Sequence, residues 1–215
     1  MKKNIAVIGL GTFGHELAVQ LSRRGHRVLA VDTDMKKVND IKDEVYIAVQ
    51  ADITDPDVLQ KLDITSFDEV VLAMSHLEAV ILAATHMKKM GVKHITGKAN
   101  TYIQKEIFEK IGIDRIILPE IDAANELAEK ITYPEIIEKV KMDNRHLLLE
   151  IKVPSHFVGK SLLDLDLRKK YGVNALMLTR NGKTGLITSP AMKFEEGDTV
   201  LLMGDEEKIH QLIGK

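Results

Sequence analysis

The sequence predicts an α/β protein, with a doubly wound parallel sheet followed by a small α+β C-terminal domain. Short apolar runs alternate with amphipathic segments from residue 4 to residue 131, and the connections between them are short. Strict alternation of this kind is typical of parallel strands with helices on both faces. After residue 145 the rhythm changes to several short strands with few helices, which indicates a second, smaller domain.

The N-terminal stretch 4–32 carries the strongest motif. An apolar run ends at Gly9, and Gly11 and Gly14 complete the spacing G-x-G-x-x-G. Gly9 allows a tight turn, Gly11 lets the backbone approach a pyrophosphate, and Gly14 lets the next helix pack closely. A second apolar run ends at Asp32, where a carboxylate can accept the ribose hydroxyls of an adenosine and repel a 2′-phosphate. The pattern predicts a Rossmann-like site for an adenine nucleotide.

The remaining elements of this domain follow from turn and cap signals. Strands are expected at 5–8, 27–31, 45–49, 69–74, 94–97 and 115–118. Asp34 and Asp55 are expected to cap helices, Pro56 to occupy a first helical position, and Gly91 to end the helix 77–90. Further helices are expected at 101–111 and 121–131.

Ligands of such sheets bind at the carboxyl ends of the strands. The residues expected at those ends are Gly9, Gly11, Thr12, Phe13, Gly14, Asp32, Asp52, Ser75, Lys98 and Glu120. They should share one edge of one sheet.

The pattern breaks at Tyr133–Pro134, and the next residues, 135–141, are expected to form a short helix. Strands are then expected at 146–153, 174–179, 185–188 and 199–203, with a turn at 181–182 and helices at 161–171 and 206–213. We therefore expect a nucleotide-binding domain at 1–133, a connecting helix and linker at 134–144, and a C-terminal domain at 145–215.

Composition narrows the functional class. The net charge is −2, with 30 Lys and Arg against 32 Asp and Glu, which argues against a nucleic-acid partner. The chain has no cysteine, so neither a thiolate nucleophile nor a cysteine metal cage is available. No apolar run approaches the roughly 18 residues that a membrane span needs. We expect a soluble cytoplasmic protein.

Two function classes remain. A small NAD-dependent oxidoreductase would need a placed acid–base residue and a substrate domain, and the second module is small for that task. The histidines show no metal-ligand spacing, and neither a nucleophile elbow nor a P-loop is present. A nucleotide-binding switch without a catalytic residue is the better interpretation.

Five runs together give a more specific resemblance. They are IAVIGLGTFG at 5–14, AVD at 30–32, KAN at 98–100, KIGIDRIILPE at 110–120 and SLLDLDLRKKYGVN at 161–174. With them the chain resembles, over nearly its whole length, the regulatory subunits of Ktr/Trk-type potassium uptake systems, an RCK or KTN domain followed by a TrkA-C domain. The resemblance implies that dimers of this chain assemble into a homo-oligomeric ring, which is expected to be an octamer. The ring would lie beneath a membrane-embedded potassium-conducting partner.

The resemblance also implies roles for individual residues. Gly11 and its neighbours would hold the phosphates of ATP, ADP or NAD(H), Asp32 the ribose, and Lys98 the phosphates again. Asp52 would border the adenine, and Glu120 would bind Mg²⁺ or Ca²⁺ at the subunit junction. Each of the last three has a structural alternative: Lys98 as a surface lysine, Asp52 as a turn residue, and Glu120 as an acid that the helix dipole favours.

Relatives of this kind suggest a further ligand for the C-terminal domain. Some bind cyclic di-AMP at a dimer interface, and Arg168 and Pro190 stand where such contacts would fall. Ala175 replaces the larger aliphatic residue that is usual there. Arg168 as a helix-end cation and Pro190 as a loop residue are the alternative interpretation.

One departure from the family pattern bears on the nucleotide. Ktr-type members often read G-L-G-R-F-G, and the arginine can reach the γ-phosphate bound by the neighbouring subunit; this chain has Thr12 there. A hydroxyl lacks that charge, so NAD(H) becomes a rival of ATP and ADP. We expect Thr12→Arg to raise the preference for ATP over ADP, measured by titrating both nucleotides into wild type and variant. An unchanged ratio of the two affinities would contradict this interpretation of position 12.

Overall fold

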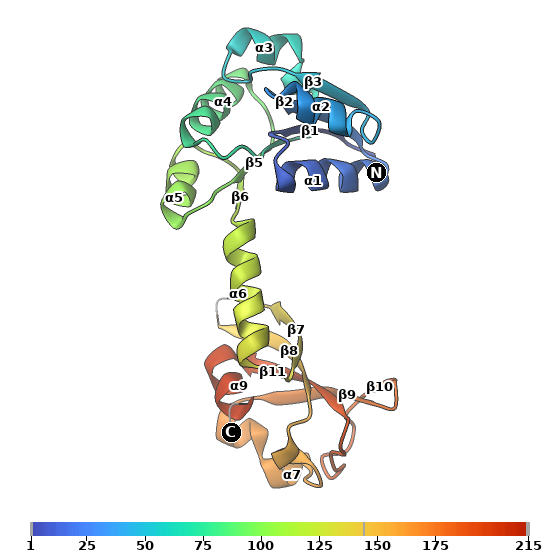
Figure 1. The fold of residues 1–215 in the computed structure, drawn as a ribbon. Helices are drawn as coiled ribbons and strands as arrows, with labels where there is room; N and C mark the ends of the chain where they lie inside the picture. The colour runs from blue at the N-terminus through green and yellow to red at the C-terminus, as the bar shows by residue number, and fades with distance from the viewer. Residues whose placement is uncertain (1, 144, 214–215) are drawn as a thin grey trace. The chain divides into compact units, whose positions relative to one another are not determined.

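The computed structural model describes residues 2–143 and 145–213 (Figure 1). The chain divides into two compact units, Met1–Ala124 and Asn125–Lys215. The division falls inside the helix α6 (Pro119–Thr132). None of the helices in the described ranges combines the length and apolar character that crossing a bilayer requires.

The first unit is built on a six-stranded parallel sheet with the order β3-β2-β1-β4-β5-β6, which confirms the predicted doubly wound fold. Its strands are β1 (Asn4–Ile8), β2 (Arg27–Asp32), β3 (Ile47–Gln50), β4 (Glu69–Leu72), β5 (Ile95–Lys98) and β6 (Arg115–Ile117). The chain first adds strands on one side of β1 and then returns to add them on the other. The switch point between β1 and β4 is where such sheets bind ligands.

Both faces of this sheet are covered because the central strands are apolar throughout. In β1, Ala6 and Ile8 join one core, whereas Ile5 and Val7 join the other. The first core also takes residues from α3 (Pro56–Lys61), α4 (Leu77–Met90) and α5 (Tyr102–Lys110). The second takes residues from α1 (Thr12–Arg23) and α2 (Met35–Ile41). A strand buried on both faces is typical of a parallel sheet.

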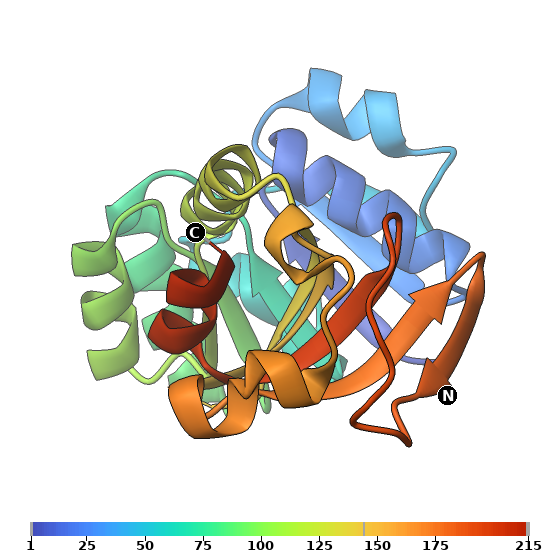
Figure 2. The same cartoon turned by 90° about the horizontal axis from the view of Figure 1, so that it is seen from below.

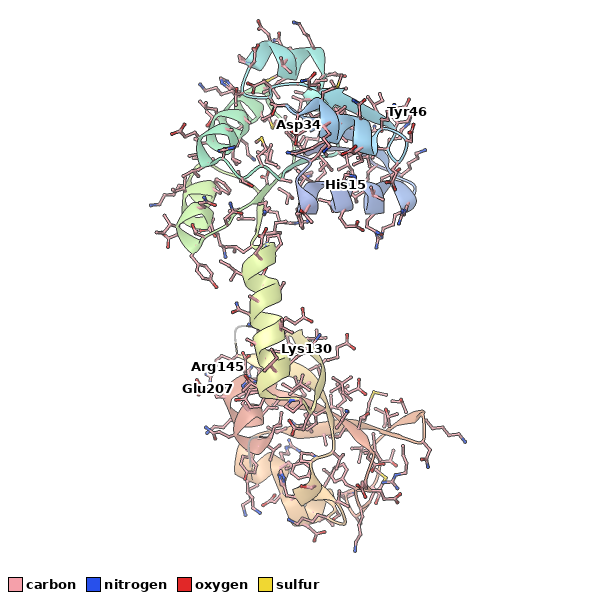
Figure 3. The ribbon with its side chains drawn as sticks, in the orientation of Figure 1. His15, Asp34, Tyr46, Lys130, Arg145 and Glu207 are labelled. Carbon is pink, nitrogen blue, oxygen red and sulfur yellow. The ribbon has the colours of Figure 1, made fainter. Side chains whose placement is uncertain are left out.

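The predicted caps are confirmed. The carboxylate of Asp34 accepts a hydrogen bond from the N–H of Lys36 at 2.9 Å, and that of Asp55 accepts one from Asp57 at 2.9 Å. Gly91 ends α4 with a φ of +85°, a conformation that glycine adopts without strain. Figure 3 shows Asp34 at the start of α2 and His15 on α1.

The second unit is built on a five-stranded antiparallel sheet with the order β10-β9-β11-β8-β7. Its strands are β7 (Ile136–Lys141), β8 (His146–Lys152), β9 (Asn174–Arg180), β10 (Lys183–Leu186) and β11 (Thr199–Asp205). The helices α8 (Leu167–Tyr171) and α9 (Glu206–Ile213) share a core with its inward-facing residues. Figure 2 shows α9, in red, beside the strands of this sheet. The predicted α+β character is confirmed.

The short helix expected at 135–141 is wrong, because these residues form the edge strand β7. Glu and Lys favour a helix, but the β-branched Ile136, Ile137 and Val140 of the same segment suit a strand. Ile136 is buried opposite Ile151, and pairing with β8 extends from there to Lys141. Most of the expected linker 134–144 therefore belongs to the C-terminal sheet.

The single helix expected at 161–171 is also wrong. Two short helices, α7 (Leu162–Leu165) and α8, meet at Asp166, whose φ is +46°. Ser161 and Asp164 form a reciprocal capping box that starts α7. The left-handed conformation of Asp166 ends α7 after one turn, and Asp is among the few residues that tolerate it.

A buried ion pair holds the loop before β11. The carboxylate of Asp198, only 1% exposed, accepts hydrogen bonds from Arg180 Nε and Nη2 at 2.8 and 2.7 Å. It also accepts one from the N–H of Glu195 at 2.8 Å. The bonds from Arg180 outweigh the effect of burial and hold the pKa of Asp198 below its ordinary 3.8.

We expect Asp198→Ala to lower the free energy of unfolding at pH 7 by about 3 kcal/mol, because it removes the buried carboxylate that Arg180 and the Glu195 N–H both donate to. The pKa of Asp198 is lowered by folding, so its contribution is complete above the ordinary value and is lost as the pH falls below it. Denaturant unfolding at pH 7 and pH 3 should therefore show the two proteins converging in acid. The exposed Glu195, replaced by Ala, should change stability by less than about 1 kcal/mol. A pH-independent difference for Asp198→Ala would contradict this account.

Candidate functional site

A cavity of about 270 Å³ lies at the carboxyl edge of the first unit's sheet, where β1 and β4 separate. Five of the residues that the sequence predicts at this site line it: Gly9, Gly11, Asp32, Asp52 and Ser75. The loops that follow β1, β2, β3 and β4 thus bring together residues that are far apart in the sequence. This is the arrangement that the motif predicts.

The glycine loop shows why its residues are glycine. Gly9 has a φ of +93°, and a Cβ there would lie 2.8 Å from the backbone N of Met74. A Cβ on Gly14, the buried glycine of the first helical turn, would lie 1.9 Å from the carbonyl O of Gly9. Gly11 has open space within 4 Å and faces the cavity, so its bare backbone is available to a ligand. Packing therefore requires glycine at positions 9 and 14, whereas it does not require glycine at position 11.

Asp32 is the buried charge of the cavity, with 8% of its surface exposed. Its Oδ2 accepts a hydrogen bond from the N–H of Leu10 at 2.6 Å, and its Oδ1 accepts one from the N–H of Asp34 at 2.9 Å. The ammonium of Lys37 lies 3.3 Å from Oδ2. Burial raises the pKa of Asp32, but the two backbone donors and Lys37 together lower it below its ordinary value. The carboxylate is thus ionised at neutral pH and can accept further hydroxyl donors.

Asp52 and Ser75 are more exposed members of the cavity wall. Asp52 Oδ1 accepts hydrogen bonds from Thr54 N–H at 3.0 Å and Thr54 Oγ1 at 2.7 Å, which lower the pKa of the carboxyl. Asp52 therefore serves the turn after β3 and borders the cavity at the same time. Both interpretations of this residue are compatible with its geometry.

Lys98 and Glu120 form a separate pair beside the same sheet edge. Lys98 is buried, at 8% exposed, and its Nζ lies 2.6 Å from Glu120 Oε1, while the Glu120 side chain is 61% exposed. The hydrogen bond from Lys98 is the main reason why the pKa of Glu120 is lowered. Lys98 is therefore not a surface lysine.

The groove next to this pair takes in two further predicted residues. Thr12 and Phe13 line it together with Glu120, and its volume is about 730 Å³. They do not line the smaller cavity in which Asp32 lies. The predicted site residues thus fall into two neighbouring groups of the first unit.

Among the cavity residues that the sequence does not predict, two carry ionisable side chains. Lys37, in the first turns of α2, pairs with Asp32, and His76 is the N-cap of α4. The only signal for Lys37 is its place one helical turn into the helix that follows Asp32. For His76 the sequence gives no signal beyond its place directly after Ser75.

The comparisons with known proteins agree with this geometry. The TrkA-N domain description matches residues 5–119, and the TrkA-C domain description matches residues 147–214. The chain belongs to the Ktr/Trk family of potassium uptake proteins. It is 37% identical to the Ktr system potassium uptake protein C of Bacillus subtilis (strain 168) over 204 residues, which are 94% of this chain and 92% of the relative. It is 34% identical to the Ktr system potassium uptake protein A of Vibrio alginolyticus over 210 residues, 96% and 94% of the two chains.

Solved structures give the same fold for this Ktr/Trk family member. The RCK domain of GsuK superposes with a TM-score of 0.64 at 15% identity, covering all of this chain and 48% of that one. The GsuK channel bound to NAD superposes with a TM-score of 0.63 at 14% identity. This chain spans about half the length of the GsuK RCK chain and less of the whole channel, covering 40% of it. At these identities the likeness establishes the fold alone.

The two glycines give a matched prediction. Gly11→Ala should fold with nearly wild-type stability, because its Cβ meets nothing, yet it should weaken nucleotide binding by filling the space that a phosphate would approach. Gly14→Ala should lower the melting temperature by several degrees, because its Cβ cannot fit against Gly9. Melting curves and nucleotide titrations of both variants separate the two roles. Unchanged nucleotide affinity in Gly11→Ala, or a loss of stability as large as that of Gly14→Ala, would contradict the role given to Gly11.

Proposed function

We propose that this protein is a cytosolic regulatory subunit that binds an adenine nucleotide and thereby controls a membrane-embedded potassium-conducting partner. The observation that carries this proposal is the buried, ionised Asp32 facing a cavity whose other wall is the bare backbone of Gly11. Family membership supplies the link to potassium uptake. The names of the relatives concern potassium uptake, and the chain covers them over more than nine-tenths of their length.

The residues of the cavity fit an adenosine phosphate. The Asp32 carboxylate would accept the ribose hydroxyls, and its charge disfavours a 2′-phosphate. The first N–H groups of α1, which begins at Thr12 directly after Gly11, would bind phosphate with the favourable end of the helix dipole. Asp52 and Ser75 would border the base. A structural neighbour is described as bound to NAD, which keeps NAD(H) beside ATP and ADP among the ligands we propose.

Glu120 and Lys98 could couple the charge of a bound nucleotide to the subunit junction. The exposed carboxylate of Glu120 would hold a divalent cation such as Mg²⁺ or Ca²⁺, which prefer oxygen ligands. Lys98, freed from this pair, would bind phosphate. A bound cation would bridge the nucleotide phosphates and the Glu120 carboxylate. The charge of the nucleotide would therefore alter the electrostatic interactions at the subunit junction.

Exposed apolar side chains support a homo-oligomer. Leu127 and Ile131 of α6 are 60% and 72% exposed and stand one helical turn apart. Tyr102 and Ile103 at the start of α5 are 60% and 70% exposed. Adjacent large apolar residues on a helix are typical of subunit interfaces. We propose that dimers of this chain assemble into a ring.

We also propose cyclic di-AMP as a ligand of the C-terminal domain. The N–H of Leu163 donates to the carbonyl O of Pro190 at 3.1 Å, so Pro190 lies against α7. Leu163 is 64% exposed, and Arg168 in the next helix is exposed as well. The exposed Leu163 beside Pro190 would suit an adenine, and the cation of Arg168 on the next helix would suit a phosphate.

The test is a melting panel of the full chain with ATP, ADP, AMP, NAD⁺ and NADH, with and without Mg²⁺ or Ca²⁺. A ligand at 100 times its Kd adds about 2.7 kcal/mol, or about 5–10 °C for a chain of this size. Asp32→Ala should abolish most of the shift. Asp57→Ala, an exposed carboxylate of α3 outside the cavity, should keep it.

Two outcomes would overturn the proposal. If no nucleotide shifts the melting temperature of the wild type, the cavity is not a nucleotide site. Steady hydride transfer from NADH to a small substrate would instead support the alternative, a small NAD-dependent oxidoreductase.

A further inference from the structure

The second unit contains a half-buried cluster of charged side chains that the proposed nucleotide function does not use. Glu129 comes from α6, Lys139 from β7, and Glu206 and His210 from α9. Their side chains are between 18% and 35% exposed. Charged side chains from α6, β7 and α9, which are separate in the sequence, thus meet in one cluster.

The ammonium of Lys139 occupies the middle of this cluster. Its Nζ lies 2.6 Å from Glu129 Oε1 and 2.5 Å from Glu206 Oε1. Burial lowers the pKa of Lys139, but the hydrogen bonds with the two carboxylates outweigh burial and raise it, so the lysine is charged. The two carboxylates therefore already bind one cation, which is part of the chain itself.

His210 gives the independent indication of a ligand. Its ring stacks on Tyr133 with centroids 4.7 Å apart, which fixes the direction of Nε2. Nε2 lies 3.2 Å from Glu129 Oε1, but the two atoms do not form a hydrogen bond. In the described part of the chain this buried nitrogen has no hydrogen-bond partner. A buried nitrogen without a partner is costly, so a group that binds it would stabilise the unit.

The net charge of the cluster also favours a bound cation. Two carboxylates share the one ammonium of Lys139, so these three groups together carry one excess negative charge, although Lys141 also attracts Glu206 electrostatically. Replacing the single charge of Lys139 by a divalent cation would balance it. Desolvated charge is stable only when it is paired.

The donor set selects the kind of cation. Three ligand atoms lie within 4.8 Å of one another, one each from Glu129, Glu206 and His210. This spacing is close enough for a single ion. Imidazole suits zinc and its neighbours in the first transition series, whereas Mg²⁺ and Ca²⁺ prefer oxygen alone. Three protein ligands would leave a position for water.

We propose that Glu129, Glu206 and His210 form a zinc-type metal site, in which the metal displaces the ammonium of Lys139. Such a metal would link the end of α6 to α9. Because α6 carries the chain from the first unit into the second, metal binding would stiffen the segment through which the two units are joined. The inference does not depend on nucleotide binding.

The experiment uses the full chain without a histidine tag, stripped with EDTA. Co²⁺ reports the site by its visible absorption, and Zn²⁺ competition gives the affinity. We expect one Co²⁺ per chain, displaced by Zn²⁺. His210→Gln should weaken Zn²⁺ binding by about 100-fold or more, since losing even an outer-shell partner costs 10–100-fold. Lys139→Met should strengthen it by about tenfold, because the competing cation is removed.

Two control variants match the chemistry of the test variants. His146→Gln removes an exposed histidine that pairs with Asp143 at 2.9 Å. Lys130→Met removes an exposed lysine of α6, labelled in Figure 3, that pairs with Glu126 at 2.6 Å. Neither should change the affinity for Zn²⁺.

Three results would overturn the proposal. The first is the absence of stoichiometric Co²⁺ or Zn²⁺ binding by the wild type, even if Lys139→Met binds. The second is equal binding by wild type and His210→Gln, which would place the metal elsewhere. The third is a loss in His146→Gln as large as in His210→Gln. Nucleotide-induced melting shifts, measured on the same samples, keep this result separate from the fate of the nucleotide proposal.

Discussion

The first unit depends on the way one buried carboxylate is held. Asp32 ends β2, and its two oxygens accept backbone N–H groups from the loop after β1 and from the start of α2. These bonds tie the glycine loop to the neighbouring strand and keep the charge in the cavity wall despite its burial. A buried charge without such donors would instead be neutralised. The same bonds thus place the loop and keep the carboxylate ionised, which are the two conditions that the proposed binding of an adenosine phosphate requires.

The parallel sheet was predictable because its signals are local and agree with one another. Asp34, Asp55 and Gly91 each mark a helix end by their own chemistry, and all three act as expected. The rules for crossover connections then limit the possible strand orders, and the structure supplies the order itself. Five predicted site residues meet in one cavity because the carboxyl ends of parallel strands share one edge.

The second unit was harder to predict because its elements depend on distant partners. Residues 135–141 favour a helix locally, and only pairing with β8 makes them a strand. The break at Asp166 needs a left-handed residue that no glycine signals. Lys139, Glu206 and His210 meet through β7 and α9, so an incorrect helix at 135–141 hid their cluster. Sequence spacing alone could not bring Glu129 to them.

The two units therefore use charge differently. In the first, a carboxylate is held ready for a ligand by backbone donors. In the second, Arg180 and Asp198 stabilise the fold, and Lys139 fills a place that a metal could take. If the two proposals hold, Asp32 and Lys139 would each respond to a bound ligand or metal, whereas the Arg180–Asp198 pair would not.

The most direct test of the central claim compares adenine nucleotides with their 2′-deoxy counterparts. Calorimetric titration of the wild type with ATP and ADP, each against its 2′-deoxy form, measures the contribution of one ribose hydroxyl. If that hydroxyl donates to the Asp32 carboxylate, removing it should weaken binding by about 10–100-fold, and the difference should vanish in Asp32→Ala. Equal affinities of the wild type for both forms would contradict the account.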